Sequence, residues 1–218
     1  MAVILGVNAS FTSNHHDPSA TLIIDGVIKA ACEEERFNRT KSSVGWFPFR
    51  SISACLKTCN IRPEEVDFIA SPGVTAGKEL EERIKKEFLH YFGVETEVRL
   101  YLHPKCHIAG AFYPSGQKRA LGLSIDGSGD GVSLMVADCC SEDGIREIER
   151  LSAKNSLGNL YSAITEHLGF HRTEGEFKVM GMAAVGTPNQ FDLASLIKEA
   201  TTLYEINDEI YSELTAKS

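Results

Sequence analysis

The chain has 218 residues, of which 43% are hydrophobic and 24% charged. This is the composition of a globular protein, not of a disordered one, and the length suits one large domain or two smaller lobes. Lys and Arg number 22 against 30 Asp and Glu, a formal charge of -8 without any basic run, which makes nucleic acid or an anionic membrane surface a poor partner.

The sequence also lacks the patterns of a membrane span and of a signal peptide. No segment approaches the roughly 20 apolar residues of a membrane span, and the start, "MAVILGVNAS", lacks the basic residues and the long apolar run of a signal peptide. The six cysteines follow neither a disulfide scaffold nor the CxxC spacing of a structural zinc site. We therefore expect reduced thiols and a cytoplasmic location.

The first half of the chain predicts three strands in succession, an antiparallel meander, and then helices and strands in turn, in the order βββαβαβ. Short apolar runs that end in Gly, Asn or Asp indicate buried strands, and Asp25-Gly26 is a strong hairpin signal. Apolar residues at helical spacing, such as Ile52, Cys55 and Cys59, indicate helices. Strands are expected over residues 2–11, 21–26, 27–37, 66–73 and 97–103, and helices over residues 49–60 and 77–93.

The same plan then begins again. Residues 120–153 predict a strand, a Gly-rich polar turn, a strand, a turn and a strand, as do residues 4–35. A helix with Pro104 in its first turn is expected between the two copies. The second set of strands is followed by a predicted helix over residues 156–170, a loop to residue 190 and a last helix from about Phe191.

A duplicated βββαβα unit predicts an α/β fold of the actin, sugar-kinase and Hsp70 type, which is ribonuclease H-like. In that superfamily the first hairpin turns of the two lobes face each other across a cleft and hold the phosphates of a nucleotide. The expected lobes are residues 1–117 and 118–218. Two unrelated antiparallel sheets are the alternative. Because one helical layer follows the second set of strands, we expect an incomplete second lobe, and hence a piece of a longer protein or a split gene.

The Gly-rich turn from Asp126 to Gly131 is a candidate binding site. Glycines let backbone N–H groups approach an anion, and a carboxylate at the end of a strand can hold a cation. No Gly-Lys-Ser/Thr follows, so the turn is not a Walker A loop. An ordinary hairpin turn explains Asp-Gly equally well.

Two histidines four residues apart, His103 and His107, are candidate metal ligands. They lie in "HPKCH", where a strand leads into a helix, so both imidazoles are expected on one side of that helix. A pair of this kind is often only surface decoration. With Asp126 at the end of the adjoining strand, however, the three side chains suit Fe, Mn or Zn.

The first turn carries a possible acid–base pair. His16 followed by Asp17 can form a general base with an oriented imidazole. The other interpretation is that Asp17 caps the turn and His16 is solvated. Glu33 to Arg36, in "EEERFNRTK", are either substrate-binding groups or a solvated strand end.

Four motifs together resemble the N-terminal domain of NodU/CmcH-type carbamoyltransferases. They are "HHDPSATLIIDGVIKAACEEERFNRTK", "HPKCHIAGAFYPSG", "LSIDGSGDG" and "EGEFKVMGMAAVG", in that order and at the expected spacing over residues 1–186. More distantly, the chain is similar to the sugar-kinase-like subunit that makes threonylcarbamoyladenosine in tRNA, which shares the HxxxH signature.

The resemblance implies an enzyme with two parts. A C-terminal YrdC-like domain would use ATP to convert carbamoyl phosphate to carbamoyl adenylate. The N-terminal domain, to which this chain corresponds, would pass the carbamoyl group to a hydroxyl of a sugar or antibiotic precursor. The resemblance places the metal on His103, His107 and Asp126, and the transfer centre on His16 with Asp17 beside it. It also places the glycine turn, Gly127, Ser128 and Gly129, at the nucleotide phosphates, and Lys178 in a motif that lines the cleft.

The chain also departs from this family in what it lacks. The family's second lobe is longer and carries a further aspartate ligand, and the YrdC-like domain would have to act in cis or in trans. We therefore expect the isolated chain to catalyse little or nothing, and a homodimer is possible. A subunit for tRNA modification and a nucleotide-binding module without catalysis are the alternative functions.

Overall fold

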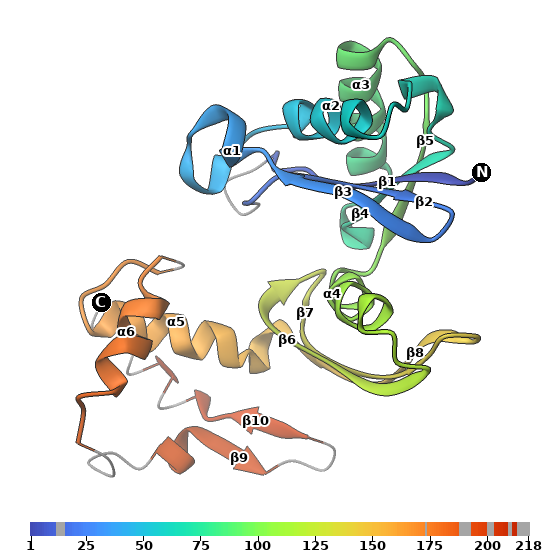
Figure 1. Ribbon diagram of the computed structural model, residues 1–218. Helices are drawn as coiled ribbons and strands as arrows, with labels where there is room; N and C mark the ends of the chain where they lie inside the picture. Colours follow the sequence, from blue (N-terminus) through green and yellow to red (C-terminus); the bar gives the residue numbers. More distant parts are fainter. Residues whose placement is uncertain (12–15, 173, 188–192, 200–202, 209–210, 213–218) are drawn as a thin grey trace. The chain divides into compact units, whose positions relative to one another are not determined.

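The computed structural model describes residues 1–11, 16–172, 174–187, 193–199, 203–208 and 211–212 (Figure 1). The chain divides into two compact units, Met1–Leu102 and His103–Ser218, and each is described by itself. The division falls earlier than the boundary expected after residue 117. The reason is that helix α4, His103–Phe112, packs on strands of the second unit.

The first unit is built on a five-stranded sheet in the order β3-β2-β1-β4-β5. Strands β1, β2 and β3 form an antiparallel meander, and β4 and β5 continue the sheet parallel to β1. The bounds are β1 Val3–Asn8, β2 Ser19–Ile24, β3 Val27–Glu33, β4 Phe68–Pro72 and β5 Glu97–Tyr101, with helices α1 Glu35–Asn38, α2 Phe49–Thr58 and α3 Gly77–Phe92. The order βββαβαβ expected from the sequence is confirmed, with one addition, the short helix α1 between β3 and α2.

The core of the first unit lies between this sheet and helices α2 and α3, which are drawn on the same side of it (Figure 1). Alternate residues of β1, namely Val3, Leu5 and Val7, are buried, as the period of a strand requires. The apolar stripes of the helices supply the facing side chains, including Ile52 and Ile84.

A buried carboxylate fixes the start of α2. Glu34 is fully buried and accepts hydrogen bonds from the backbone N–H and the hydroxyl of Ser51, both at 2.9 Å. Ser51 lies in the first turn of α2, where backbone N–H groups lack partners within the helix. The predicted strand over residues 27–37 therefore stops at Glu33, because Glu34 turns inward and α1 begins at Glu35.

The second unit holds an antiparallel sheet in the order β6-β7-β8. Helix α4 packs on β6 and β7, and helix α5 packs along β6. A small apolar cluster contains Leu160 of α5, Ile206 of the short β9–β10 hairpin and Leu196, which directly precedes β9. The bounds are β6 Arg119–Gly129, β7 Val132–Cys140, β8 Gly144–Ser152, α5 Leu157–His167, α6 Glu176–Ala183, β9 Ile197–Glu199 and β10 Tyr204–Ile206.

Two expectations for the C-terminal part are wrong. The loop expected over residues 171–190 contains α6, whose apolar residues are spread around the helix and do not form the single stripe by which a sequence indicates a helix; none of its residues is buried. The helix expected from about Phe191 is instead a 3-10 turn at Leu193–Leu196 followed by the β9–β10 hairpin. Phe191 itself lies outside the described residues.

The antiparallel meander β1–β2–β3 recurs as β6–β7–β8, and the chain is an α/β protein of the actin-like, ribonuclease H-like class. All six cysteines are free thiols. Within the described ranges, no helix combines the length and the apolar character that a membrane crossing requires.

Candidate functional site

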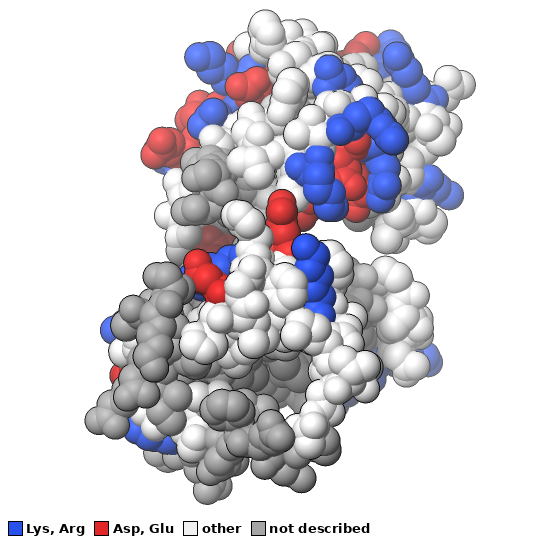
Figure 2. Space-filling view, turned by 90° about the vertical axis from the view of Figure 1, so that its left-hand side faces the viewer, with Lys and Arg blue, Asp and Glu red and all other residues white. Residues whose placement is uncertain are grey.

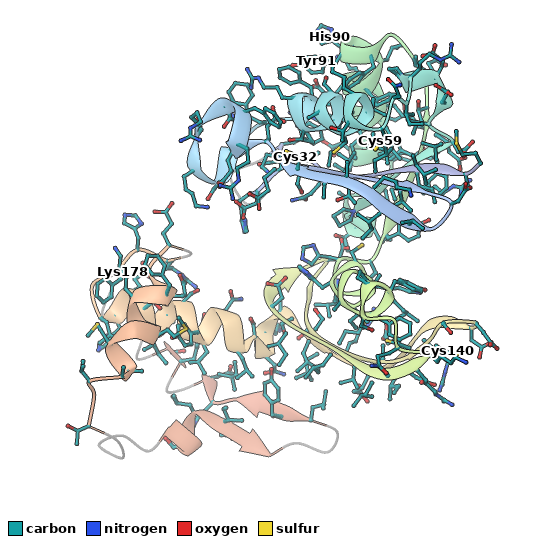
Figure 3. The ribbon with its side chains drawn as sticks, in the orientation of Figure 1. Cys32, Cys59, His90, Tyr91, Cys140 and Lys178 are labelled. Carbon is teal, nitrogen blue, oxygen red and sulfur yellow. The ribbon has the colours of Figure 1, made fainter. Side chains whose placement is uncertain are left out.

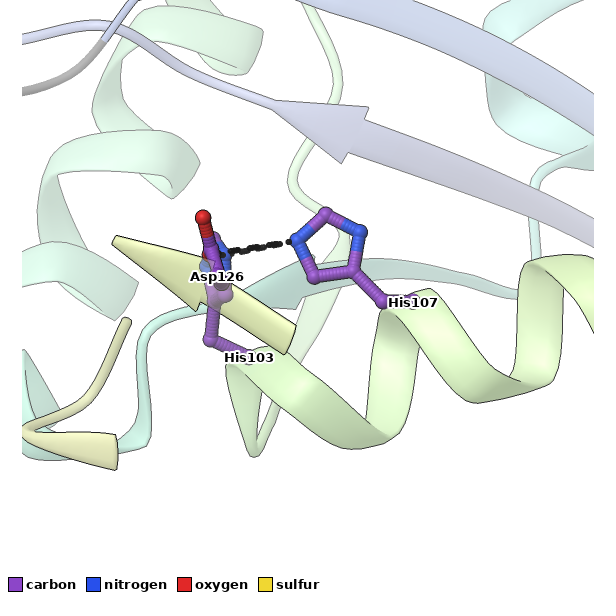
Figure 4. A group of neighbouring side chains, drawn as sticks. All are labelled: His103, His107 and Asp126. Atoms are coloured by element: carbon purple, nitrogen blue, oxygen red, sulfur yellow. Dashed lines mark hydrogen bonds and ion pairs between the residues drawn. The ribbon is translucent and has the colours of Figure 1, made fainter. Parts of the chain in front are cut away.

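Two elements of the second unit bring the expected metal ligands together. His103 opens α4 and His107 lies one turn further along the same face of the helix. Asp126 comes from β6, at a place where the pairing of β6 with β7 is irregular between Ile125 and Gly129. Such an irregularity changes the direction in which a strand side chain points, and here the carboxylate points to the two imidazoles (Figure 4).

The three ligand atoms form a small triangle. His103 Nε2 lies 3.0 Å from Asp126 Oδ2 and 2.9 Å from His107 Nε2, and His107 Nε2 lies 3.5 Å from Asp126 Oδ2. Divalent ions bind imidazole and carboxylate at about 2.0–2.2 Å, which places neighbouring ligand atoms about 3.0–3.5 Å apart. The triangle therefore fits one face of the ligand shell of a divalent metal ion.

The charges of the triad favour a cation as well. Hydrogen bonds to His103 and His107 hold the pKa of the Asp126 carboxyl well below its usual range, so the carboxylate is ionised. The hydrogen bond to Asp126 raises the pKa of the His107 imidazole. Burial raises the pKa of the neighbouring Cys106 thiol to about 11, which keeps it protonated and makes it a poor ligand.

Metal binding at this triad should weaken as the pH falls. Protons compete with the metal for the His107 nitrogen, and its raised pKa means that the proton leaves at a higher pH than the usual 6.5. Affinity for Co²⁺, measured by titration between about pH 5.5 and 8, should rise with pH and still be rising above 6.5. An affinity that is constant over this range would contradict the expectation.

The turn after Asp126 packs closely against the first ligand. A Cβ atom on Gly129 would lie 2.0 Å from Cδ2 of His103, so the imidazole occupies the space that any other side chain would need. The backbone carbonyl of Asp126 accepts a hydrogen bond from Ser156 Oγ at 3.0 Å, and Ser156 also caps α5. Residues of β6, α4 and α5 thus hold the site in place.

Gly129→Ala should displace the His103 ring and weaken metal binding, because the new methyl group cannot share that space. A loss of about 10-fold or more in Co²⁺ affinity is expected, as for a lost outer partner of a metal ligand. Gly110→Ala is the control, since a Cβ on Gly110 would meet nothing within 4 Å. Wild-type affinity in the Gly129 variant would show that the ring is not held in this place.

The glycine turn has a packing role that sequence reasoning did not find. Gly129 is buried beneath the His103 ring, whereas Ser128 is exposed. The N–H of Gly127 donates to the Asp126 carboxylate at 2.6 Å. A glycine at residue 129 is therefore required by the triad itself, whether or not a phosphate binds at the turn.

In the first unit, His16 and Asp17 are paired. The His16 Nδ1 atom lies 2.6 Å from Asp17 Oδ2, and both side chains are about half exposed. The amide of Asn8 donates to the backbone carbonyls of both residues, at 3.1 and 3.0 Å. Asp17 has φ = +56°, and its N–H donates to the carbonyl of Ser42. These contacts fix the backbone that carries the pair.

Lys41 is a neighbour of this pair that the sequence did not single out. Its ammonium bonds to Glu35 at 3.1 Å, which raises the pKa of Lys41, and the Asp17 carboxylate adds to the same effect. Arg36 pairs with Glu33 at 2.9 Å. On the face of the first unit shown in Figure 2, basic and acidic side chains alternate in the same manner. Lys41 is distinguished from the other paired basic residues by its proximity to Asp17. The spacing of residues along the sequence does not reveal this proximity.

Lys178 lies on α6 and is exposed (Figure 3). Its ammonium lies 5.7 Å from the ring centre of Phe170 and 5.8 Å from that of Phe177.

Comparison with known proteins decides the family. The family described as "Carbamoyltransferase N-terminus" matches residues 75–216, more than half of the chain. The chain belongs to the carbamoyltransferase N-terminus family. The matched region contains His103, His107 and Asp126, whereas His16 and Asp17 lie before it.

Relatives in this family are considerably longer. The Synechocystis sp. protein sll1178, named an uncharacterized protein, is 32% identical over 88% of this chain and 36% of its own length. The uncharacterized protein MJ1051 of Methanocaldococcus jannaschii is 33% identical over 84% of this chain and 35% of its own length. Nodulation protein NolNO of Sinorhizobium fredii is 32% identical over 79% of this chain and 28% of its own length. The chain thus spans about a third of the length of these relatives.

Solved structures resemble the chain only at low similarity. Component A of the (R)-2-hydroxyglutaryl-CoA dehydratase of Acidaminococcus fermentans has a TM-score of 0.45 and 17% identity, over 87% of this chain and 71% of that one. YeaZ from Pseudomonas aeruginosa has a TM-score of 0.42 and 13% identity, over 70% of this chain and 67% of that one. The fold class therefore rests on the strand order and not on these likenesses.

Proposed function

We propose that the chain is the N-terminal part of an O-carbamoyltransferase that acts on a hydroxyl of a sugar, an antibiotic precursor or a Nod-factor-like acceptor. Family membership supports the reaction class. Two relatives are named nodulation proteins, which is the reason to include a Nod-factor-like acceptor. The donor would be carbamoyl adenylate, formed from carbamoyl phosphate, ATP and water with release of phosphate and pyrophosphate. AMP would leave as the acceptor oxygen bonds to the carbamoyl carbon.

The observation that carries the proposal is the convergence of His103, His107 and Asp126. Two imidazole nitrogens and an ionised carboxylate suit Fe²⁺ best in this proposal, with Mn²⁺ or Zn²⁺ as alternatives. A divalent ion bound there would supply positive charge for an oxygen of the carbamoyl donor. Asp126 would contribute the negative charge that holds the ion, and the neutral imidazoles of His103 and His107 would be its nitrogen ligands.

His16 is the proposed base for the acceptor hydroxyl. With its Nδ1–H donating to Asp17 at 2.6 Å, the ring is held in the tautomer that leaves Nε2 free to accept a proton. The Asp17 carboxylate then stabilises the imidazolium that forms when the hydroxyl gives up its proton. Exposure of the His16 side chain gives an acceptor access to the ring.

Gly127, Ser128 and Gly129 are proposed to lie at the nucleotide phosphates, with Lys178 as a further contact. Exposure of Ser128 and Lys178 supports access for a ligand. The contact between Gly129 and His103 leaves Gly127 and Ser128 as the better candidates for an approach to phosphate.

The carbamoyl-adenylate-forming activity would reside in a YrdC-like domain, in cis or in trans, and the complete enzyme would act in the cytoplasm. The chain covers 36% or less of the relatives above. We therefore expect no transfer from the chain by itself.

A transfer assay tests the proposal. The chain is incubated with ATP, radiolabelled carbamoyl phosphate, Fe²⁺ and a hydroxyl acceptor, with and without the adenylate-forming domain. Label should reach the acceptor only when both proteins are present. Transfer by the chain alone would contradict the proposed division of labour. Lack of transfer by the intact enzyme in the presence of carbamoyl adenylate would contradict the transferase.

A further inference from the structure

We propose that Asp130 is a positioning residue for the three-ligand site. It would hold the backbone of His103 and so set the place of α4 on the β6–β7 hairpin. The inference rests on the proposed metal centre, and it concerns a residue that belongs to none of the three ligands. Three observations on the turn that contains Asp130 carry it.

The first contact is made to the backbone of a ligand. The N–H of His103 donates to Asp130 Oδ2 at 2.8 Å, although the two residues are 27 positions apart in the sequence. His103 is the first residue of α4, where backbone N–H groups have no partner within the helix. A carboxylate there accepts the hydrogen bond and interacts favourably with the helix dipole. Pro104, which follows, has no N–H to offer in its place.

The second observation concerns the rigidity of the turn. Gly129 pairs with Val132, so Asp130 and Gly131 form the two-residue loop of the β6–β7 hairpin. Both have positive φ, +54° and +76°, the pattern of a type I′ turn. Such a turn fixes the direction of its side chains, and aspartate accepts this backbone better than most residues do. The carboxylate is therefore presented from a defined position.

The third contact is made to the ring of the same ligand. The imidazole of His103 lies over Gly129, at the position where a Cβ would stand. Residues 126–130 thus supply one ligand, room for the ring of a second, and the acceptor for its backbone N–H. Because His107 lies on the same helix, an error in the start of α4 would move both imidazoles relative to Asp126.

Two substitutions separate the carboxylate from the turn. Asp130→Gly removes the acceptor but suits a type I′ turn, whereas Asp130→Asn keeps both an acceptor oxygen and the backbone conformation. The matched control is Asp25→Gly in the β2–β3 hairpin. Asp25 and Gly26 also have positive φ, +49° and +77°, and Asp25 accepts from the backbone N–H of Ala2 at 2.7 Å. The control removes the same kind of contact in the other unit.

The full 218-residue chain and the three variants are titrated with Co²⁺, followed by visible absorption and by competition with a chelator. Asp130→Gly should bind Co²⁺ about 10- to 100-fold more weakly, with an altered spectrum, as expected when a group supporting a ligand is lost. Asp130→Asn and Asp25→Gly should keep both the affinity and the spectrum of the wild type. A direct ligand role for Asp130 would instead weaken Asp130→Asn as well.

The inference is overturned if Asp130→Gly keeps the wild-type affinity and spectrum, if Asp130→Asn is as weak as Asp130→Gly, or if Asp25→Gly is equally weak. The NMR signal of the His103 amide proton provides a readout without metal. It should lie downfield in the wild type and in Asp130→Asn, and shift upfield in Asp130→Gly. If the wild type binds no Co²⁺, the metal centre fails while this shift still supports positioning, and an unchanged signal overturns it.

Discussion

Replacing His103 with alanine is expected to abolish metal binding at the triad. His103 Nε2 is the closest atom to both of the other ligand atoms, at 2.9 Å from His107 and 3.0 Å from Asp126. Without it, one imidazole and one carboxylate are left, and two ligands hold a divalent ion far more weakly than three. The loss should exceed the 10- to 100-fold that is typical for a lost outer partner of a ligand.

Metal content after anaerobic loading with Fe²⁺ and removal of free ion, together with Co²⁺ titration, measures this effect. His90→Ala is the matched control, because His90 is an exposed histidine on α3 of the first unit (Figure 3). Only the His103 variant should lose its metal. Equal metal content in both variants and the wild type would place the ion elsewhere and remove the physical basis of the proposed centre.

That His103, His107 and Asp126 lie together could be predicted, because their positions reflect local geometry. Residues four apart on a helix share a face, and Asp126 was expected at the end of the adjoining strand. The residues that support the ligands were not predictable in this way. Asp130 and Ser156 contact His103 and Asp126 from positions 27 and 30 residues away, and only the folded chain brings them there.

The same distinction holds for the fold. Strands β1, β2 and β4 and helices α2 and α3 bury apolar side chains at regular spacing, so their periodicity indicated them. Strands β3, β6 and β8 bury no apolar side chain, and the turn residues and the repeated pattern of the sequence indicated them instead. Helix α6 buries nothing, and "EGEFKVMG" with its glycines therefore read as a loop. Glu34 shows that burial can also go unnoticed in the sequence. It is the fully buried one of three successive glutamates, and nothing in the sequence distinguishes it from its two neighbours.

Replacing His16 with alanine is the other change with a large expected effect, and it acts on transfer without acting on the metal. Loss of a general base typically costs about 10²–10⁴-fold in rate. The variant should therefore show a fall of that size in carbamoyl transfer to the acceptor, measured in the intact enzyme or with the adenylate-forming domain in trans. Formation of carbamoyl adenylate and bound metal should stay at wild-type values, since the three ligands belong to the second unit.

Asp17→Asn distinguishes orientation from charge in the same assay. Asparagine tolerates the positive φ of residue 17 and can still accept from Nδ1, so the His16 ring keeps its orientation while the imidazolium loses its anionic partner. Transfer should fall less than in His16→Ala, with the larger part of the loss in the turnover rate. A module that only binds nucleotide would be indifferent to both substitutions. Wild-type transfer by His16→Ala would assign the proton to another group, and the pairing of His16 with Asp17 would then be a feature of the turn alone.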